Sequence, residues 1–282
     1  MMKLSVFTVM VPDLTPSELL PLLKENGYDA VEWRYKSIDP QFEQENFSFW
    51  RNNFCTIQPN WKSEELLKLR KETEKLGIET LSVTPYLTCG DLEATEDVLK
   101  KAKLLGANMI RIGVPRYDGA LPFSDLLQQA KRYVKEVEEL CKQYQIKGLV
   151  ETHHQTIAPS ASLALRLVEE SNPDHIGVLY DPGNMVHEGY EDYRMGIAML
   201  GSYLAHVHAK NAAYFSKEQE GIKKWQGKWV RIDRGIVDWV EVMNALKESG
   251  YQGYVGMEDF SETFPSKEAL AFNAQYLKSF VE

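Results

Sequence analysis

Cysteine is scarce in this chain, whose 282 residues contain only three, Cys55, Cys89 and Cys141. They are far apart in the sequence, odd in number and without a CxxC pair. This pattern excludes a disulfide framework and gives no sign of a thiolate metal site. We therefore expect the protein to work in a reducing compartment.

Basic charge is also in short supply, because 32 lysines and arginines face 41 acidic residues, giving a formal charge of −9 and a pI near 5.3. Such a surface repels phosphate backbones, so we expect no nucleic-acid partner. No stretch approaches the ~18 apolar residues needed to span a bilayer, and residues 1–12 lack the basic region of a secretory leader. We expect no membrane partner and a cytoplasmic location.

Two common nucleotide-binding motifs are missing as well. The first apolar run is followed by Val11-Pro12-Asp13-Leu14 and not by a GxGxxG turn, and no P-loop is present. What the chain does have is a composition typical of folded proteins, with 44% apolar and 26% charged residues. It can therefore bury a sizeable core.

Short apolar runs rich in β-branched residues alternate with longer segments of helical period along the whole chain. One clear helical stripe places Leu126, Ala130, Val134, Val137 and Cys141 at three- and four-residue steps. Eight strands are predicted: Leu4–Val9, Ala30–Trp33, Glu79–Val83, Met109–Ile112, Gly148–Glu151, Gly177–Tyr180, Leu204–His208 and Tyr254–Glu258.

Eight strand-helix units with short returns predict an α/β fold, a single closed (β/α)8 TIM barrel spanning residues 1–282. A doubly wound open sheet is the alternative. Two longer segments, Lys36–Lys62 and Asn211–Gly235, are rich in aromatic residues and are expected as insertions on the C-terminal rim of the barrel. Such insertions serve either as a substrate lid or as a subunit interface, and their presence favours a homo-oligomer, a dimer or tetramer.

Polar side chains stand where the last four predicted strands end. These endings contain Glu151, Asp181, His208 and Glu258. Consecutive strands of a barrel end on one arc of its mouth, so these four side chains can meet at a single cation. Three carboxylates and one imidazole suit Mn²⁺ or Mg²⁺, and the histidine also allows Co²⁺ or Zn²⁺. The sequence therefore predicts a divalent-metal site.

Two motifs carry a resemblance that covers essentially the whole chain. They are His206-Val207-His208 before Ala209-Lys210, and Asp181-Pro182-Gly183-Asn184 after a buried strand. With these motifs the chain resembles the xylose isomerase-like TIM barrel superfamily, and within it the sugar phosphate isomerase/epimerase family. The resemblance implies that Glu151, Asp181, His208 and Glu258 bind a divalent metal, with Mn²⁺ favoured, which in turn binds a small polyol or keto-sugar.

The resemblance also implies a reaction. In the ketose 3-epimerases that this chain resembles, the glutamates matching Glu151 and Glu258 lie on opposite faces of the substrate, and proton transfer passes through a metal-stabilised enediolate. Two positions depart from that pattern, because Asn184 and Tyr214 stand where those enzymes have a histidine and an arginine. Ketose 3-epimerisation is therefore less favoured than another reaction on a polyol, a cyclitol or a keto-acid.

Further polar residues lie beside these strand ends and are candidates for substrate binding. Glu32 ends the second strand, and its alternatives are to orient substrate, to orient a histidine or to pair with an arginine. Lys210 follows the histidine ligand by two residues and is suited to an anionic group or to proton donation. The complete set is Glu32, Arg111, His153, Asn184, His187, His206 and Lys210.

Two reactions remain open at this point. The first is isomerisation or epimerisation of a sugar, and the alternative is a metal-dependent dehydratase of the inosose or dehydroshikimate type found in the same superfamily. Both begin by removing a proton next to a carbonyl group. The sequence alone does not separate them.

Overall fold

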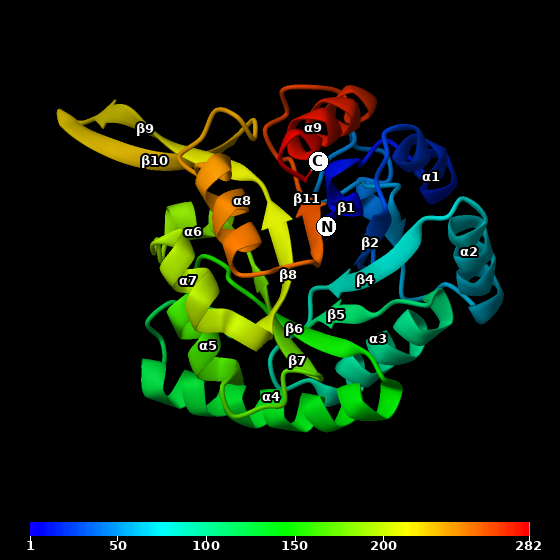
Figure 1. The fold of residues 1–282 in the computed structure, drawn as a ribbon, viewed down its shortest axis with the longest axis horizontal. Helices are drawn as coiled ribbons and strands as arrows, with labels where there is room; N and C mark the ends of the chain where they lie inside the picture. The colour runs from blue at the N-terminus through cyan, green and yellow to red at the C-terminus, as the bar shows by residue number, and fades with distance from the viewer. Residues whose placement is uncertain (282) are drawn as a thin grey trace.

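The computed structural model describes residues 1–281, in which eight parallel strands close into a barrel surrounded by helices (Figure 1). Strand β1 pairs with both β2 and β11, which joins the two ends of the sheet. The barrel strands are β1 (Lys3–Phe7), β2 (Ala30–Tyr35), β4 (Glu79–Pro85), β5 (Met109–Arg111), β6 (Lys147–Glu151), β7 (Ile176–Tyr180), β8 (Leu204–Ala209) and β11 (Tyr254–Met257). The predicted TIM barrel is confirmed, and the open sheet is excluded.

Helices follow the strands and cover the outside of the barrel. The stripe predicted from Leu126 to Cys141 lies on the longest of them, where its apolar residues are buried. The helices are α1 (Pro16–Glu25), α2 (Ser63–Lys75), α3 (Leu92–Leu105), α4 (Phe123–Tyr144), α5 (Ala161–Val168), α6 (Pro182–His187), α7 (Tyr193–Leu200), α8 (Trp239–Glu248) and α9 (Ser266–Val281). None of the helices in this part of the chain combines the length and hydrophobicity that a membrane crossing requires.

The first strand is shorter than predicted. It ends at Phe7, and Thr8–Met10 form a turn of 3-10 helix where the sequence pattern suggested further strand. The reason is hydrogen bonding with residues distant in sequence, because the Asn53 side chain donates to the Val9 carbonyl and the Thr8 hydroxyl accepts from the Arg34 backbone N–H. These bonds turn the chain across the mouth of the barrel.

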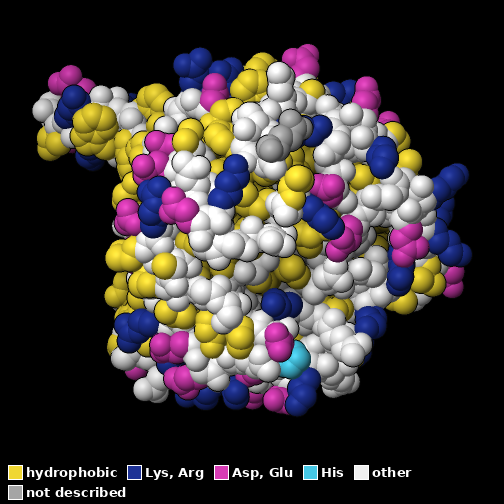
Figure 2. All heavy atoms as spheres, viewed as in Figure 1, with side chains coloured by type: hydrophobic (Ala, Val, Ile, Leu, Met, Phe, Trp, Pro, Cys, Tyr) yellow, Lys and Arg dark blue, Asp and Glu magenta, His cyan; other side chains and the backbone are white. Residues whose placement is uncertain are grey.

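The segment after β2 runs through a short 3-10 helix, Pro40–Phe42, to the two-residue strand β3 (Thr56–Ile57), which pairs with the end of β2. The segment after β8 forms an antiparallel hairpin of β9 (Asn211–Gln219) and β10 (Ile222–Val230). This hairpin projects from the body of the molecule (Figure 1), and Figure 2 shows hydrophobic side chains on it. Trp225 is 62% exposed there. Both segments follow the carboxyl ends of barrel strands.

Candidate functional site

The four expected metal ligands come together at the carboxyl ends of the strands. Glu151 is the last residue of β6, Asp181 and Glu258 directly follow β7 and β11, and His208 lies in β8. One nitrogen or oxygen atom from each of the four lies within 4.8 Å of those of the other three, and all four residues are buried. Parallel pairing of β8 with β7 and β11 produces this convergence.

The ring of His208 is held with one nitrogen toward the carboxylates and the other away from them. Its Nε2 lies 2.9 Å from Glu32 Oε2, and Phe7 stacks on the ring with centroids 5.8 Å apart. Its Nδ1 lies 3.5 Å from Glu258 Oε2 and 3.7 Å from both Glu151 Oε1 and Asp181 Oδ2, and is without a hydrogen-bond partner in the described residues. A buried nitrogen facing three carboxylates fits a divalent cation.

Two side-chain cations offset the negative charge of these carboxylates. Lys210 Nζ lies 2.9 Å from Asp181 Oδ2 and also pairs with Glu258, while Arg111 Nη1 lies 2.7 Å from Glu151 Oε2. Burial opposes ionisation of Glu151 and Glu258, but Arg111, His208 and Lys210 outweigh it, so that both pKa values lie below the ordinary value. Both glutamates are therefore ionised at neutral pH.

Asn184, in the position that departs from the epimerase pattern, is buried beside the ligands. Its Nδ2 donates to Asp181 Oδ2 at 2.9 Å, and its Oδ1 lies 3.2 Å from His154 Nδ1. Asn184 also lies at the cavity wall. The residue therefore connects a carboxylate ligand to a histidine of the cavity and remains within reach of a bound molecule.

A cavity of about 570 Å³ opens above the carboxylates. Its polar lining includes Glu151, His153, Arg116, Lys210 and Glu258. The aromatic part of the lining comes from five residues, Phe7, Trp50, Tyr86, Trp229 and Phe260. Aromatic faces beside a few charged groups suit a small molecule that has apolar C–H faces and polar edges.

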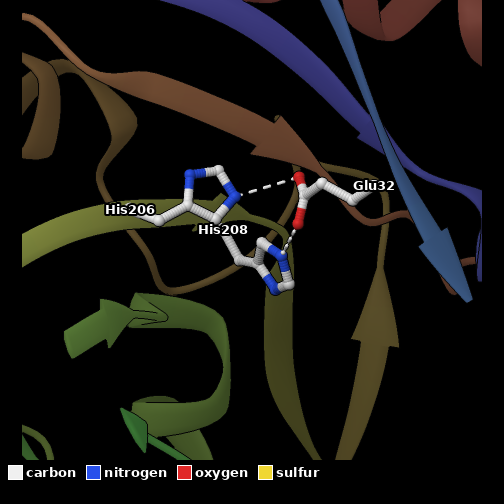
Figure 3. A group of neighbouring side chains, drawn as sticks. All are labelled: Glu32, His206 and His208. Carbon is white, nitrogen blue, oxygen red and sulfur yellow. Dashed lines mark hydrogen bonds and ion pairs between the residues drawn. The ribbon is translucent and has the colours of Figure 1, made fainter. Parts of the chain in front are cut away.

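Three residues expected at the substrate do not line this cavity. Glu32 and His206 are buried next to His208 (Figure 3). His206 Nδ1 lies 3.1 Å from the Tyr254 carbonyl oxygen. His187 lies behind the wall, where its ring centroid is 4.6 Å from that of Trp229. These residues are placed to support the groups that face the cavity.

Several cavity residues were not singled out from the sequence. His154 is one of them, because strand alternation favoured His153 as the inward-facing residue. The strand has already ended there, and Gln155 has a positive φ of 60°, so His153 and His154 stack with ring centroids 4.4 Å apart and both reach the cavity. The position of Phe260 could have been predicted, because it follows the strand-end residue Glu258 by two residues and so lies near the mouth of the barrel.

Sequence comparison finds distant relatives that match part of the chain. An uncharacterised protein from Methanocaldococcus jannaschii is 24% identical over 153 residues, 52% of this chain and 49% of that protein. Inosose dehydratase from Lacticaseibacillus casei is 27% identical over 111 residues, 36% of each chain. The chain therefore spans between about a third and a half of the length of these curated relatives.

Solved structures match almost the whole chain. A probable 3-DHS dehydratase, AsbF of Bacillus anthracis, is 18% identical with a TM-score of 0.70 and coverage of 98% and 99%. An IOLI protein with a bound zinc atom is 17% identical, with a TM-score of 0.72 and coverage of 97% and 96%. D-psicose 3-epimerase, crystallised with D-fructose, is 15% identical, with a TM-score of 0.70 and coverage of 99% of each chain. At this level of identity the likeness establishes the fold.

The family itself is shown by the sequence profile. Residues 20–280 match the profile described as xylose isomerase-like TIM barrel, which includes every barrel strand after the first. Enzymes are prominent among the structural neighbours, and they include sugar epimerases and a dehydratase. This chain belongs to the xylose isomerase-like TIM barrel family.

Proposed function

We propose that this protein is a divalent-metal-dependent isomerase or epimerase that moves a proton next to the carbonyl group of a small sugar, polyol or keto-sugar. The observation that carries the proposal is the convergence of Asp181 and His208 with Glu151 and Glu258, two ionised glutamates that line the cavity. Sugar epimerases among the structural neighbours support the same reaction class.

Glu151, Asp181, His208 and Glu258 would hold the cation. When bound, a divalent cation supplies Lewis-acid chemistry, which makes a C–H bond next to a carbonyl group more acidic. Mn²⁺ is our choice of native metal because oxygen ligands predominate in the set, and Mg²⁺, Co²⁺ and Zn²⁺ are the alternatives.

The side chains then have distinct tasks. One of the two glutamates removes the proton from the carbon next to the carbonyl group. The other takes up a proton from solvent and delivers it to the carbon skeleton. Arg111 is already bonded to Glu151 through Nη1 and to the Pro85 carbonyl through Nη2 at 2.9 Å, so it fixes the direction of that carboxylate. Trp50 and Trp229, one from each insertion, provide aromatic faces in the cavity lining.

A dehydratase is the second candidate, and two observations favour it. A curated relative of part of the chain is an inosose dehydratase, and Lys210 places an ammonium group at the cavity beside Glu258. In this reaction a glutamate takes the proton next to the carbonyl group and the C–O bond of the β-hydroxyl breaks. Lys210 then donates a proton to the departing oxygen, which leaves as water.

The two reactions differ in the mass of their products. The purified, metal-loaded protein is incubated in D₂O with ketoses, inososes and cyclic keto-acids, and the products are followed by mass spectrometry and NMR. An isomerase or epimerase yields a product with the same molecular formula as the substrate, except that deuterium replaces hydrogen at the reacting carbon. A dehydratase yields a product lighter by one water. Absence of exchange and of product with every compound, while metal is bound, contradicts both reactions.

We also propose that residues 1–282 act as one barrel domain, in the cytoplasm, as a homodimer or homotetramer. The exposed aromatic residues of the two insertions support self-association, with Trp50 49% exposed and Phe215 48% exposed. Sedimentation of the purified protein tests the assembly. A monomer across the micromolar range contradicts it and leaves the insertions as parts of a lid.

A further inference from the structure

The carboxylate of Glu32 is buried. It faces the rings of both His206 and His208 (Figure 3). Its Oε2 lies 2.9 Å from His208 Nε2, and its Oε1 lies 2.9 Å from His206 Nε2 and accepts a hydrogen bond of 2.8 Å from Ser5 Oγ. Both of its oxygens are therefore engaged by buried groups from β1 and β8. A carboxylate held from three sides has a fixed direction.

The strand that precedes Glu258 is shaped to leave room for this carboxylate. Gly256, on β11, has no side chain, and a Cβ atom at this position would lie 2.1 Å from Glu32 Oε1 and 2.9 Å from His206 Nε2. Any larger residue there would displace Glu32. The same strand thus provides a ligand at its end and a space for Glu32 in its middle.

We propose that Glu32 is a positioning residue of the metal site and that it acts through His208. The inference rests on the proposed metal centre. Glu32 accepts the hydrogen bond from His208 Nε2–H, so a metal that replaces the second proton of the ring would find the lone pair on Nδ1, the atom that faces Glu151, Asp181 and Glu258. The negative charge of Glu32 also makes this nitrogen a stronger donor to a metal.

Glu32, His206 and His208 could themselves be taken for a second metal site, because one atom from each lies within 4.8 Å of the others. The contacts argue otherwise. Glu32 Oε2 is already hydrogen-bonded to His208 Nε2 and Oε1 to Ser5 Oγ, and the backbone of Gly256 lies close against Oε1. We therefore expect one ion per chain, with Glu32 outside its coordination sphere.

The test uses the full chain and three substitutions. Glu32→Gln keeps the size of the side chain but removes its charge. Ser5→Ala leaves the Glu32 charge in place and removes only one hydrogen bond to it. Glu138→Gln is the matched control, because Glu138 is also a buried glutamate, 5% exposed, but it lies on α4 and bonds Lys135 and the Asn172 N–H.

Mn²⁺ and Zn²⁺ affinities are measured by calorimetry. We expect Glu32→Gln to weaken binding about 10-fold or more and Ser5→Ala about threefold, while Glu138→Gln binds as the wild type. In ¹⁵N NMR of the Zn²⁺-loaded wild type, the proton of His208 is expected on Nε2. Melting of the metal-free variants separates loss of affinity from loss of folding.

Some results would overturn the inference. Wild-type affinity in both Glu32→Gln and Ser5→Ala, a proton on His208 Nδ1, or two ions per chain would each do so. If Glu32→Gln does not fold, Ser5→Ala and the wild-type NMR spectrum still decide the matter. A wild-type protein that binds neither metal refutes the proposed metal centre itself, which is a different failure from unchanged affinity in the variants.

Discussion

Lys210 Nζ lies 2.9 Å from Asp181 Oδ2, inside the group of carboxylates proposed to bind a divalent cation. Its ammonium group is also 5.0 Å from the centroid of the Trp229 ring and is buried. In the absence of a metal ion, this lysine partly compensates the carboxylates that would otherwise repel one another. When an ion binds, the two positive charges compete for the same oxygens.

Lys210→Met tests this competition. We expect the variant to bind Mn²⁺ on the order of tenfold more tightly, because a like charge next to the ion has been removed. We also expect the metal-free variant to melt at a lower temperature, because its buried carboxylates have lost a partner. Calorimetry and melting curves with and without Mn²⁺ measure the two effects, and weaker binding would contradict the competition.

Glu151→Gln and Glu258→Gln test the two proposed proton carriers. Each is expected to lower the rate of substrate deuterium exchange by about 10²–10⁴, because an amide cannot accept the proton. Metal content is measured in parallel, so that loss of a base is separated from loss of the ion. Glu138→Gln is the control and should retain wild-type exchange. A metal-loaded variant that exchanges at the wild-type rate removes that glutamate from the mechanism.

The stability of the protein should depend on pH through His154. Burial, together with the positive charges of His153, His187 and Lys210, lowers the pKa of His154 to about 3. The unfolded chain has an ordinary histidine pKa near ~6.5, so between these values it binds more protons than the folded chain. The free energy of unfolding should therefore fall as the pH is lowered from 6.5 toward 5.

His154→Gln measures this contribution, because glutamine retains a polar side chain but does not titrate. Urea denaturation at a series of pH values should give a flatter profile for the variant than for the wild type between pH 6.5 and 5. Above pH 7.5 the two profiles should run parallel. An identical slope in the lower range would show that His154 is not buried as a neutral ring.

Two tryptophans on β10 provide a matched test of the cavity wall. Trp229 lines the cavity, whereas Trp225, four residues earlier on the same strand, is 62% exposed. We expect Trp229→Ala to lower kcat/KM about 10- to 100-fold, because it opens the site and removes a face for the substrate. Trp225→Ala should retain the wild-type value, and an equal loss in both variants would instead implicate the hairpin as a whole.

The sequence predicts the central part of this site because the rules involved are local. Short apolar runs rich in β-branched residues locate β6, β7, β8 and β11, and parallel pairing then brings their polar endings together. The lengths of the strands are less predictable. The sequence pattern extends the first strand to Val9, whereas β1 ends at Phe7. The side chain of Asn53, which is distant in sequence, donates a hydrogen bond to the Val9 carbonyl.

The residues that form the cavity walls cannot be predicted from such local rules. Trp50 and Trp229 belong to segments recognised as insertions, but their conformation depends on contacts with Phe260, whose ring centroid lies 4.9 Å and 5.9 Å from theirs. The hairpin did have a local signal, because Glu220-Gly221 forms a turn with positive φ at both residues between two aromatic-rich strands. The charged residues next to the turn, Lys217, Glu218, Lys223 and Lys224, interrupt the apolar pattern of the strands and obscured this signal.

Glu32 and His208 are 176 residues apart in sequence but are joined by a single hydrogen bond, and β1 completes the ring only when it meets β11. A ribosome makes β1 and β2 first and β11 last. Throughout translation, therefore, the emerging polypeptide carries an open sheet edge and an incomplete set of ligands. The proposed ion can meet all four of its ligands only after Glu258 has been synthesised. Full coordination of the ion would therefore coincide with closure of the barrel.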